Sequence, residues 1–319
     1  MPALNVSRSI NIDSDPQTVF DRLRDFRTWG EWSPWLLADP KTTVTVSENA
    51  DDVGAIYGWD GEIVGAGSME HLGLSAPAEH GNQGSIQCKL RFTRPWKSEA
   101  DVRFVIVPSD PSGKSTTVHW EMDSNLPFFL FWMKGMMQSL ISMDYERGLK
   151  MAKELIESGR IESKTEAFGS VGVEPRRILG ITSFAKLPAV GPAMEKVVVE
   201  AKQKLEAAGI PSDGQWVSVY DHLNLKTRDL RFTTGIEVSG STPIPSGMVE
   251  KKINGGKAIH VTHVGRYDHL GNAWFTAHQV LQSGTHKKLK QAAYEVYENT
   301  PDNAAPEDLV THVYLPVKA

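Results

Sequence analysis

The chain has 319 residues, of which 40% are hydrophobic and 23% are charged, and its formal net charge is −5. This length can supply two domains with a sizeable core each, and the composition argues against wholesale disorder. The acidic balance argues against a generic binder of nucleic acid or of anionic membranes.

The single cysteine, Cys88, excludes an internal disulfide, and its expected role is that of a small buried hydrophobe. The N-terminal segment contains no apolar signal core. The most hydrophobic run, residues 126–137, is too short to span a bilayer and contains Lys134. These features predict a soluble, cytoplasmic protein without membrane insertion.

The first half opens with an alternating strand over residues 4–12 and a helix that Asp15 can cap, with Pro16 at its first position. Strand-like runs separated by Gly, Pro or Asp follow at 42–48, 54–63, 65–74, 85–92, 100–108 and 115–122. Apolar residues then recur every three or four positions over about 127–158, which predicts a long closing helix. The expected architecture is an antiparallel sheet crossed by that helix.

Residues 159–175 are polar, rich in small residues and without a sustained period. We therefore expect a linker at 160–173, between a first domain over 1–159 and a second over 174–319.

The second half repeats itself: residues 178–194 align with 258–274, matching Thr182 to Thr262, Gly191 to Gly271 and Ala193 to Ala273. Two strand patterns follow each predicted helix, at 215–222 and 230–238 and again at 292–299 and 309–317. The expected fold is a duplicated βαββ domain with two helices on one face of a sheet, so the whole chain is α+β.

The first half carries the segments "VFDRLRDFRTWGEWSPW", "GAIYGWDGEIVGAGSME" and "DYERGLKMAKELIE". On these segments, residues 1–160 resemble the SRPBCC superfamily, which is START-like and includes the polyketide cyclase/dehydrase group. The resemblance implies a helix-grip fold with a deep hydrophobic cavity for lipids or other apolar molecules. It does not imply one reaction.

The second half carries "HVTHVGRYDHLGNAW", "AAYEVYENTP" and "HVYLPVK". On these segments, residues 171–319 resemble the gyrase-inhibitor-like (GyrI-like) small-molecule-binding domain, which is also the effector-binding domain of AraC- and MerR-type activators. The resemblance implies a cleft between the repeats that Glu295 faces. In some relatives this glutamate meets cationic drugs, and others are similar to hydrolases of cyclopropane-containing toxins. No helix-turn-helix pattern precedes the domain, so we do not expect an intact regulator.

On a strand, Glu295 shares one face with Tyr297, and Tyr294 shares the other with Val296. A solvated carboxylate on an edge strand is the alternative to a cleft residue. The aromatic residues expected to bind ligand around Glu295 are Trp216, Tyr220, Tyr267, Trp274, Tyr297 and Tyr314. Desolvation by such rings would raise the pKa of the carboxyl group and suit it to act as a general base. If the group stays ionised, it suits a cationic, planar ligand.

The cavity candidates in the first half are Trp35, Tyr57, Trp59, Phe92 and Trp120. Ordinary core packing is the alternative for each of them, because a sheet under a long helix needs aromatic residues as core.

The sequence has no GxSxG elbow, no P-loop and no GxGxxG after a strand, so we expect no nucleophilic triad and no nucleotide cofactor. His260, His263 and His269 are close in sequence, but 260 and 263 would point to opposite faces of a strand. We therefore expect neither a metal nor any other cofactor.

The leading hypothesis is a protein with two pockets that senses or sequesters lipophilic or cationic aromatic compounds. The alternative is a hydrolase of a reactive small molecule, with Glu295 as general base and with Tyr314 or Tyr297 positioning water or stabilising charge. A third possibility is an adaptor with a protein partner or a homodimer.

Overall fold

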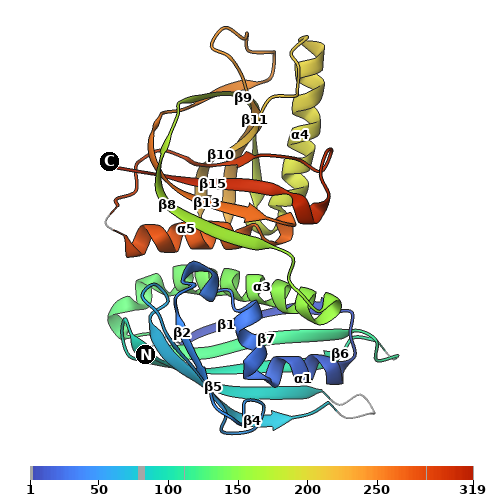
Figure 1. The fold of residues 1–319 in the computed structure, drawn as a ribbon, viewed down its shortest axis with the longest axis vertical. Coiled ribbons are helices and arrows are strands. Elements are labelled where there is room, and N and C mark those ends of the chain that lie inside the picture. The colour runs from blue at the N-terminus through green and yellow to red at the C-terminus, as the bar shows by residue number, and fades with distance from the viewer. Residues whose placement is uncertain (1–2, 78–82, 111, 285, 319) are drawn as a thin grey trace. The chain divides into compact units, whose positions relative to one another are not determined.

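The computed structural model describes residues 3–77, 83–110, 112–284 and 286–318. Contacts between Cα atoms divide the chain into two compact units, Met1–Ile161 and Glu162–Ala319. Each unit is built on one antiparallel sheet with helices, so the chain is α+β, as predicted (Figure 1).

The first unit has a seven-stranded sheet in the order β1-β7-β6-β5-β4-β3-β2. Its strands are β1 (Ala3–Ile12), β2 (Thr43–Val46), β3 (Ile56–Asp60), β4 (Ala66–Ser75), β5 (Gly84–Arg94), β6 (Ser98–Pro108) and β7 (Thr116–Asn125). Its helices are α1 (Pro16–Arg24), α2 (Trp29–Trp32) and α3 (Lys134–Ser158), with 3-10 turns η1 (Phe26–Thr28), η2 (Leu36–Ala38) and η3 (Phe128–Met133).

Local signals set the ends of these helices. The Asp15 side chain accepts a hydrogen bond from the backbone N–H of Thr18, and Pro16 is the first residue of α1. Gly159 ends α3 in the left-handed region with φ 79°. The predicted long helix is therefore present, but its first turns form the separate η3.

The long helix α3 crosses the sheet of this unit (Figure 1) and packs against it through Tyr145, Leu149, Ala152 and Leu155, which are all buried. The close approach requires Gly148, because a Cβ atom there would lie 2.8 Å from the ring of Trp120. The interior of the unit is one continuous hydrophobic cluster in which the rings of the sheet meet those of the helices.

The second unit has an eight-stranded sheet in the order β12-β9-β11-β10-β14-β15-β13-β8. Its strands are β8 (Lys164–Val173), β9 (Arg176–Lys186), β10 (Trp216–Asn224), β11 (Asp229–Glu237), β12 (Val249–Ile253), β13 (Gly256–Val264), β14 (Ala293–Tyr297) and β15 (Val310–Val317). Its helices are α4 (Val190–Ala207) and α5 (Gly271–Ser283), with 3-10 turns η4 (Leu187–Ala189), η5 (Tyr267–His269) and η6 (Pro306–Asp308).

The prediction of a linker at 160–173 was wrong, because β8 occupies Lys164–Val173 and pairs antiparallel with β13. This strand lies at the edge of the sheet, and most of its side chains are exposed or half-buried. A register shift at His260 and a left-handed Gly169 interrupt its pairing. An exposed, bulged edge strand shows no apolar alternation, which explains why the pattern did not reveal it.

The two faces of the second sheet bury different side chains. On one face, Val197, Ala201 and Leu205 of α4 pack beside Trp216 and Tyr297. The same face carries the core under α5, which includes Ala273, Ala277, Ile259, Val261, Val313 and Leu315. The opposite face carries a separate cluster of Ile178, Val217, Val219, Ile253, Tyr294 and Val296, with Tyr314 packed against it.

None of the helices in the described ranges combines the length and the apolar character that a membrane span requires.

Candidate functional site

Three aromatic side chains enclose the Glu295 carboxylate on the helix-bearing face of the second sheet. The Tyr220 and Tyr297 hydroxyls donate to Oε2 at 2.7 and 2.5 Å, and the Trp274 indole N–H donates to Oε1 at 2.5 Å. Glu295 is 1% exposed and lies on β14, in the middle of the sheet. The alternative of a solvated carboxylate on an edge strand is therefore excluded.

The donors converge because of the register of two central strands and the position of one helix. Ser218 of β10 pairs with Glu295 of β14, and Tyr220 pairs with Ala293. Trp274 belongs to the first turn of α5. The predicted sharing of faces within β14 is confirmed, because Tyr297 lies with Glu295 and both point away from the cluster of Tyr294 and Val296.

A chain of hydroxyl groups continues behind Tyr297. The Tyr297 Oη lies 3.0 Å from Ser218 Oγ, which lies 2.7 Å from Thr234 Oγ1. Because Tyr297 has one proton and donates it to Glu295, its oxygen is available to accept from Ser218. We did not anticipate Ser218, although the alternation of β10 places it on the face of Trp216 and Tyr220.

Further rings complete the wall of the site. Tyr220 meets Trp274 edge to face, with centroids 4.9 Å apart, and Tyr267 meets Tyr297 edge to face at 6.0 Å. Tyr267 is 39% exposed, so this ring lies where the site approaches solvent. Trp216 is buried in the core under α4 and has no hydrogen bond to Glu295 among those described.

Burial raises the pKa of Glu295 above its usual value, although hydrogen bonds from Tyr297, Tyr220 and Trp274 to the ionised form oppose the rise. Burial and the neighbouring carboxylate raise the pKa values of Tyr220 and Tyr297 well above the usual 10.0. Burial first, and then Glu295, raise the pKa of Tyr267 to about 12. All three tyrosines are therefore neutral hydrogen-bond donors at physiological pH.

Tyr314 does not belong to this site. It pairs with Tyr294 across β14 and β15, whereas Glu295 pairs with Val313. Tyr314 stacks on Tyr294 at 4.9 Å on the sheet face opposite Glu295. The prediction that Tyr314 assists Glu295 was wrong, because the register of the β14–β15 pair turns its side chain to the other face.

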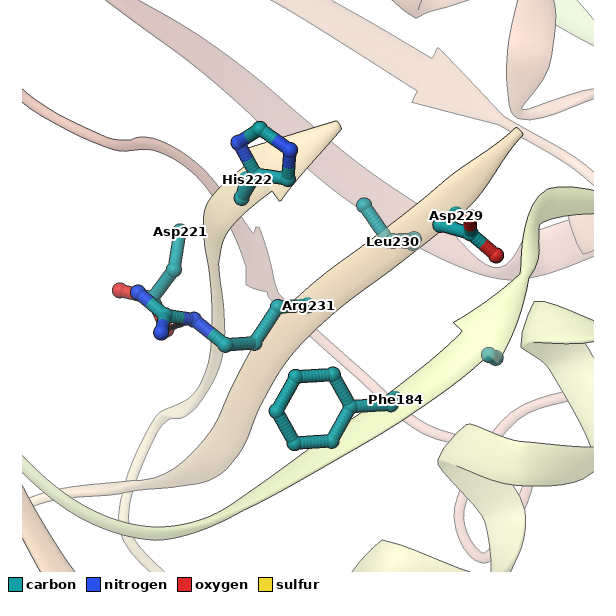
Figure 2. Close-up of a pocket in the computed structure, with 7 residues that line it drawn as sticks. Phe184, Asp221, His222, Asp229, Leu230 and Arg231 are labelled. Carbon is teal, nitrogen blue, oxygen red and sulfur yellow. Dashed lines mark ion pairs between the residues drawn. The ribbon is translucent and has the colours of Figure 1, made fainter. Parts of the chain in front are cut away.

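The two described hollows lie elsewhere in the second unit. The larger, of about 590 Å³, is lined by Phe184, Ala185, Asp221, His222, Asp229, Leu230 and Arg231 (Figure 2). Within it, Arg231 Nε lies 3.9 Å from Asp221 Oδ2. The smaller, of about 340 Å³, lies along Asn254–Lys257 and the end of β15. No predicted ligand-binding residue lines either hollow. Glu295, which is enclosed by rings, therefore lies outside both.

In the first unit, Trp120 is core. It is 1% exposed and stacks between Tyr145, at 3.9 Å and 12°, and Phe104, at 5.0 Å and 26°. Both faces of its ring are therefore covered by protein. Tyr57 is also buried, and burial raises its pKa to about 12.

Trp35, Trp59 and Phe92 are only partly buried, and the first two pack at the margin of that core. Trp59 and Phe92 meet edge to face at 5.4 Å. The Trp35 indole donates to Asp144 at 3.1 Å, and Asp144 is paired with Arg147 at 2.7 Å. These three rings keep part of their surface available.

Several buried polar atoms of the first unit have no hydrogen-bond partner among the residues that the structure describes. They include the Tyr57 hydroxyl, both ring nitrogens of His71 and the Trp120 indole nitrogen. Burial, and then Arg24, lower the pKa of His71 to about 4. This interior is consequently neutral around Tyr57 and His71, in contrast to the site around Glu295.

Comparisons with protein families agree with this two-unit organisation. Residues 3–157 match the family described as polyketide cyclase / dehydrase and lipid transport. Residues 171–318 match the GyrI-like small molecule binding domain. No curated protein matches the sequence.

Three solved structures illustrate the range of similar chains. The EcmrR C-terminal domain is 15% identical over 50% of this chain and 99% of its own, with a TM-score of 0.38. SAV2435, solved bound to tetraphenylphosphonium, is 12% identical over 48% of this chain and 94% of its own, with a TM-score of 0.37. A START superfamily protein from Mycobacterium smegmatis is 23% identical over 48% of this chain and 97% of its own, with a TM-score of 0.32.

The chain therefore joins an N-terminal domain that resembles the SRPBCC and polyketide cyclase families to a C-terminal domain that resembles the GyrI-like small-molecule-binding family.

Proposed function

We propose that the second unit binds a small aromatic cation and that Glu295 supplies the counter-charge. The observation that carries this proposal is a buried carboxylate that receives three hydrogen bonds from neutral aromatic donors. Among the described residues, no ion pair is made by Glu295, and no cationic side chain contributes to its pKa shift.

A buried charge without a counter-ion is costly unless hydrogen bonds offset the desolvation. The three donors at Glu295 offset part of that cost in the free protein. A cationic ligand would offset more, because Coulomb attraction is strong where water is excluded. The site therefore favours a cation over an anion even before a ligand binds.

The rings around the carboxylate suit the same ligand. Tyr220, Trp274 and Tyr267 present faces and edges to which a flat or bulky aromatic cation can stack, with an additional cation–π contribution. Because the carboxylate itself is 1% exposed, ligand entry requires displacement of at least one ring. Trp274 and Tyr220 are the half-buried candidates.

The proposed site lies at the junction of two repeats. The sheet order is symmetric about the β10–β14 pair, with β9-β11-β10 on one side and β14-β15-β13 on the other. Strand β8 precedes the first set and pairs with β13 of the second set. Strand β12 precedes the second set and pairs with β9 of the first set. This symmetry supports a duplicated βαββ plan, and a repeat junction would be a natural position for a ligand site.

We propose a second, apolar ligand site in the first unit. Transfer of a charge into this apolar, ring-lined interior is costly, so we assign a neutral ligand to it. The half-buried Trp35, Trp59 and Phe92 are the contact residues that we assign to it, whereas Trp120 serves the core. With both sites, the chain would sense or sequester lipophilic and cationic aromatic compounds.

The hydrolase alternative has weaker support. The raised pKa of Glu295 is a property of a general base. However, Tyr314 lies on the opposite face, and both carboxylate oxygens already accept hydrogen bonds.

Tetraphenylphosphonium tests the proposal, because it carries one delocalised positive charge, four rings and no hydrogen-bonding group. Calorimetric titration should give saturable binding to the full chain, and Glu295→Gln should weaken that binding at least about tenfold. Tetraphenylborate, with a similar shape and the opposite charge, should bind the wild type far more weakly. Equal affinity of wild type and Glu295→Gln for the cation would refute the role of Glu295.

A further inference from the structure

Two histidines and a threonine meet on the sheet face opposite Glu295. His260 and Thr262 lie on β13, and His312 lies on the adjacent β15. His260 Nε2 is 3.1 Å from His312 Nδ1, and Thr262 Oγ1 is 3.3 Å from the first nitrogen and 3.1 Å from the second. Three atoms that can donate electron pairs therefore form a nearly equilateral triangle.

The rings are held in place by their neighbours. His260 lies in a row of stacked rings, between Phe168 at 4.9 Å and 18° and Tyr314 at 4.6 Å and 8°. Tyr314 in turn stacks on Tyr294 at 4.9 Å. This row crosses four adjacent strands, β8, β13, β15 and β14, and fixes the plane of the His260 imidazole.

The second histidine is oriented by a carboxylate. His312 Nε2 lies 3.1 Å from Glu298 Oε2, so its other nitrogen, Nδ1, is turned toward His260. A carboxylate that receives the distal N–H of an imidazole fixes the tautomer whose remaining nitrogen can bind a metal. Glu298 therefore stands to His312 as an outer carboxylate stands to a metal-binding histidine, and Nδ1 is the nitrogen left to bind the metal.

From this geometry we propose that His260, His312 and Thr262 form a binding site for a divalent transition-metal ion. Two ligands about 2.1 Å from one ion are about 3.0 Å apart at a right angle and about 3.4 Å apart at the tetrahedral angle. The three separations of 3.1, 3.1 and 3.3 Å fall within that interval. One ion can therefore contact all three atoms with small side-chain adjustments.

The chemistry of the ligands selects the class of metal. Imidazole nitrogens favour copper(II), nickel(II) and zinc over calcium and magnesium, which prefer oxygen. Burial, and then His312, lower the pKa of His260 to about 4, so this ring is neutral and able to coordinate at pH 7. Both histidines are half-buried, which leaves the site accessible to an ion from solvent.

In the described ranges, no three His, Cys, Asp or Glu side chains gather in an arrangement that could hold a metal ion. The proposed site has two histidines and one hydroxyl, so water or an external ligand would fill its remaining positions. His263, which is close in sequence, lies buried on the other face and takes no part. The grouping therefore depends on pairing between strands and could not be read from the spacing of histidines along the chain.

The test titrates the full chain with copper(II), nickel(II) and zinc separately by calorimetry. The expected result is one saturable ion per chain for at least one metal. Affinity should fall at least tenfold in His312→Gln and in His260→Phe, since phenylalanine preserves the ring stack. His222→Gln, which changes an exposed histidine of β10, should leave affinity within twofold of wild type.

Copper(II) electron paramagnetic resonance provides a second measurement. The wild-type spectrum should show coupling to two imidazole nitrogens, and that of His312→Gln should show coupling to one. Circular dichroism establishes that each variant is folded, and His312→Gln carries the test if His260→Phe does not fold. The proposal is overturned if the wild type binds no metal saturably, or if folded His312→Gln retains wild-type affinity and spectrum.

Discussion

The two units of the chain bury polar groups in opposite ways. At Glu295 the second unit encloses a carboxylate and directs three donors at its two oxygens. Around Tyr57 and His71 the first unit encloses neutral groups for which the described part of the chain supplies no hydrogen-bond partner. Both environments are walled by aromatic rings, so apolar surroundings alone do not distinguish them.

The difference lies in which ligand each environment can accept. A carboxylate that accepts hydrogen bonds from fixed donors favours an incoming positive charge, whereas burial of a charge in the apolar interior of the first unit would be costly. The comparison supports our proposal that the second unit binds a cation and the first unit a neutral lipophile. Substitutions in one unit at a time test this difference.

The largest expected effect is the loss of the core tryptophan of the first unit. Trp120→Ala should lower the free energy of unfolding of that unit by about 3–5 kcal/mol, because both ring faces are packed. Trp96→Ala, at a ring that is 60% exposed, should change it by less than about 0.5 kcal/mol. Urea denaturation followed by fluorescence measures both. Similar losses in the two variants would mean that Trp120 is not a core residue.

His71 should make the first unit sensitive to acid. Its folded pKa of about 4 lies below the usual 6.5, so the unfolded state binds more protons between these values. The contribution of His71 to stability is fully present above pH 6.5 and should fall, by about 3 kcal/mol, as pH approaches 4. His71→Leu should remove this part of the pH dependence in urea titrations at several pH values. Parallel curves for variant and wild type would contradict a neutral, unpartnered imidazole.

Glu295 should give the second unit the opposite dependence. Its folded pKa lies above the usual 4.5, so the folded state holds the proton more tightly than the unfolded state. Stability should decline as pH rises from 4.5 through the folded pKa. Glu295→Gln should abolish this decline, and Glu307→Gln, at an exposed position, should preserve it. If stability still declines with pH in Glu295→Gln, another titrating group causes the decline.

The smallest expected effect separates the two sheet faces. Tyr314→Phe should leave tetraphenylphosphonium affinity within about twofold of wild type, because this hydroxyl lies opposite Glu295. Tyr297→Phe removes a direct donor to the carboxylate and should change affinity by severalfold. A larger change in Tyr314→Phe than in Tyr297→Phe, measured by calorimetry, would reverse the assignment of faces.

Alternation along a single strand predicted part of the environment of Glu295. Period two places Tyr297 beside it and Tyr294 on the other face, and the resemblance of the segment to a known family directed attention to this carboxylate. Trp274 and Tyr220 were expected near it, and both donate to it.

Relationships between strands were not predictable in the same way. Alternation within the last strand does not show which face Tyr314 occupies, because its pairing with Tyr294 decides this. His260 and His312 are brought together by the same kind of register. The edge strand β8 was missed because its side chains are largely exposed and carry no apolar alternation.

The most direct test of the charge preference at Glu295 is the pH dependence of tetraphenylphosphonium affinity, since this cation does not titrate. In the wild type, affinity should increase as pH rises above 4.5 and should level off once the buried carboxyl group is ionised. In Glu295→Gln, affinity should be weak and independent of pH over the same range. Wild-type and variant affinities that follow the same pH profile would contradict the account.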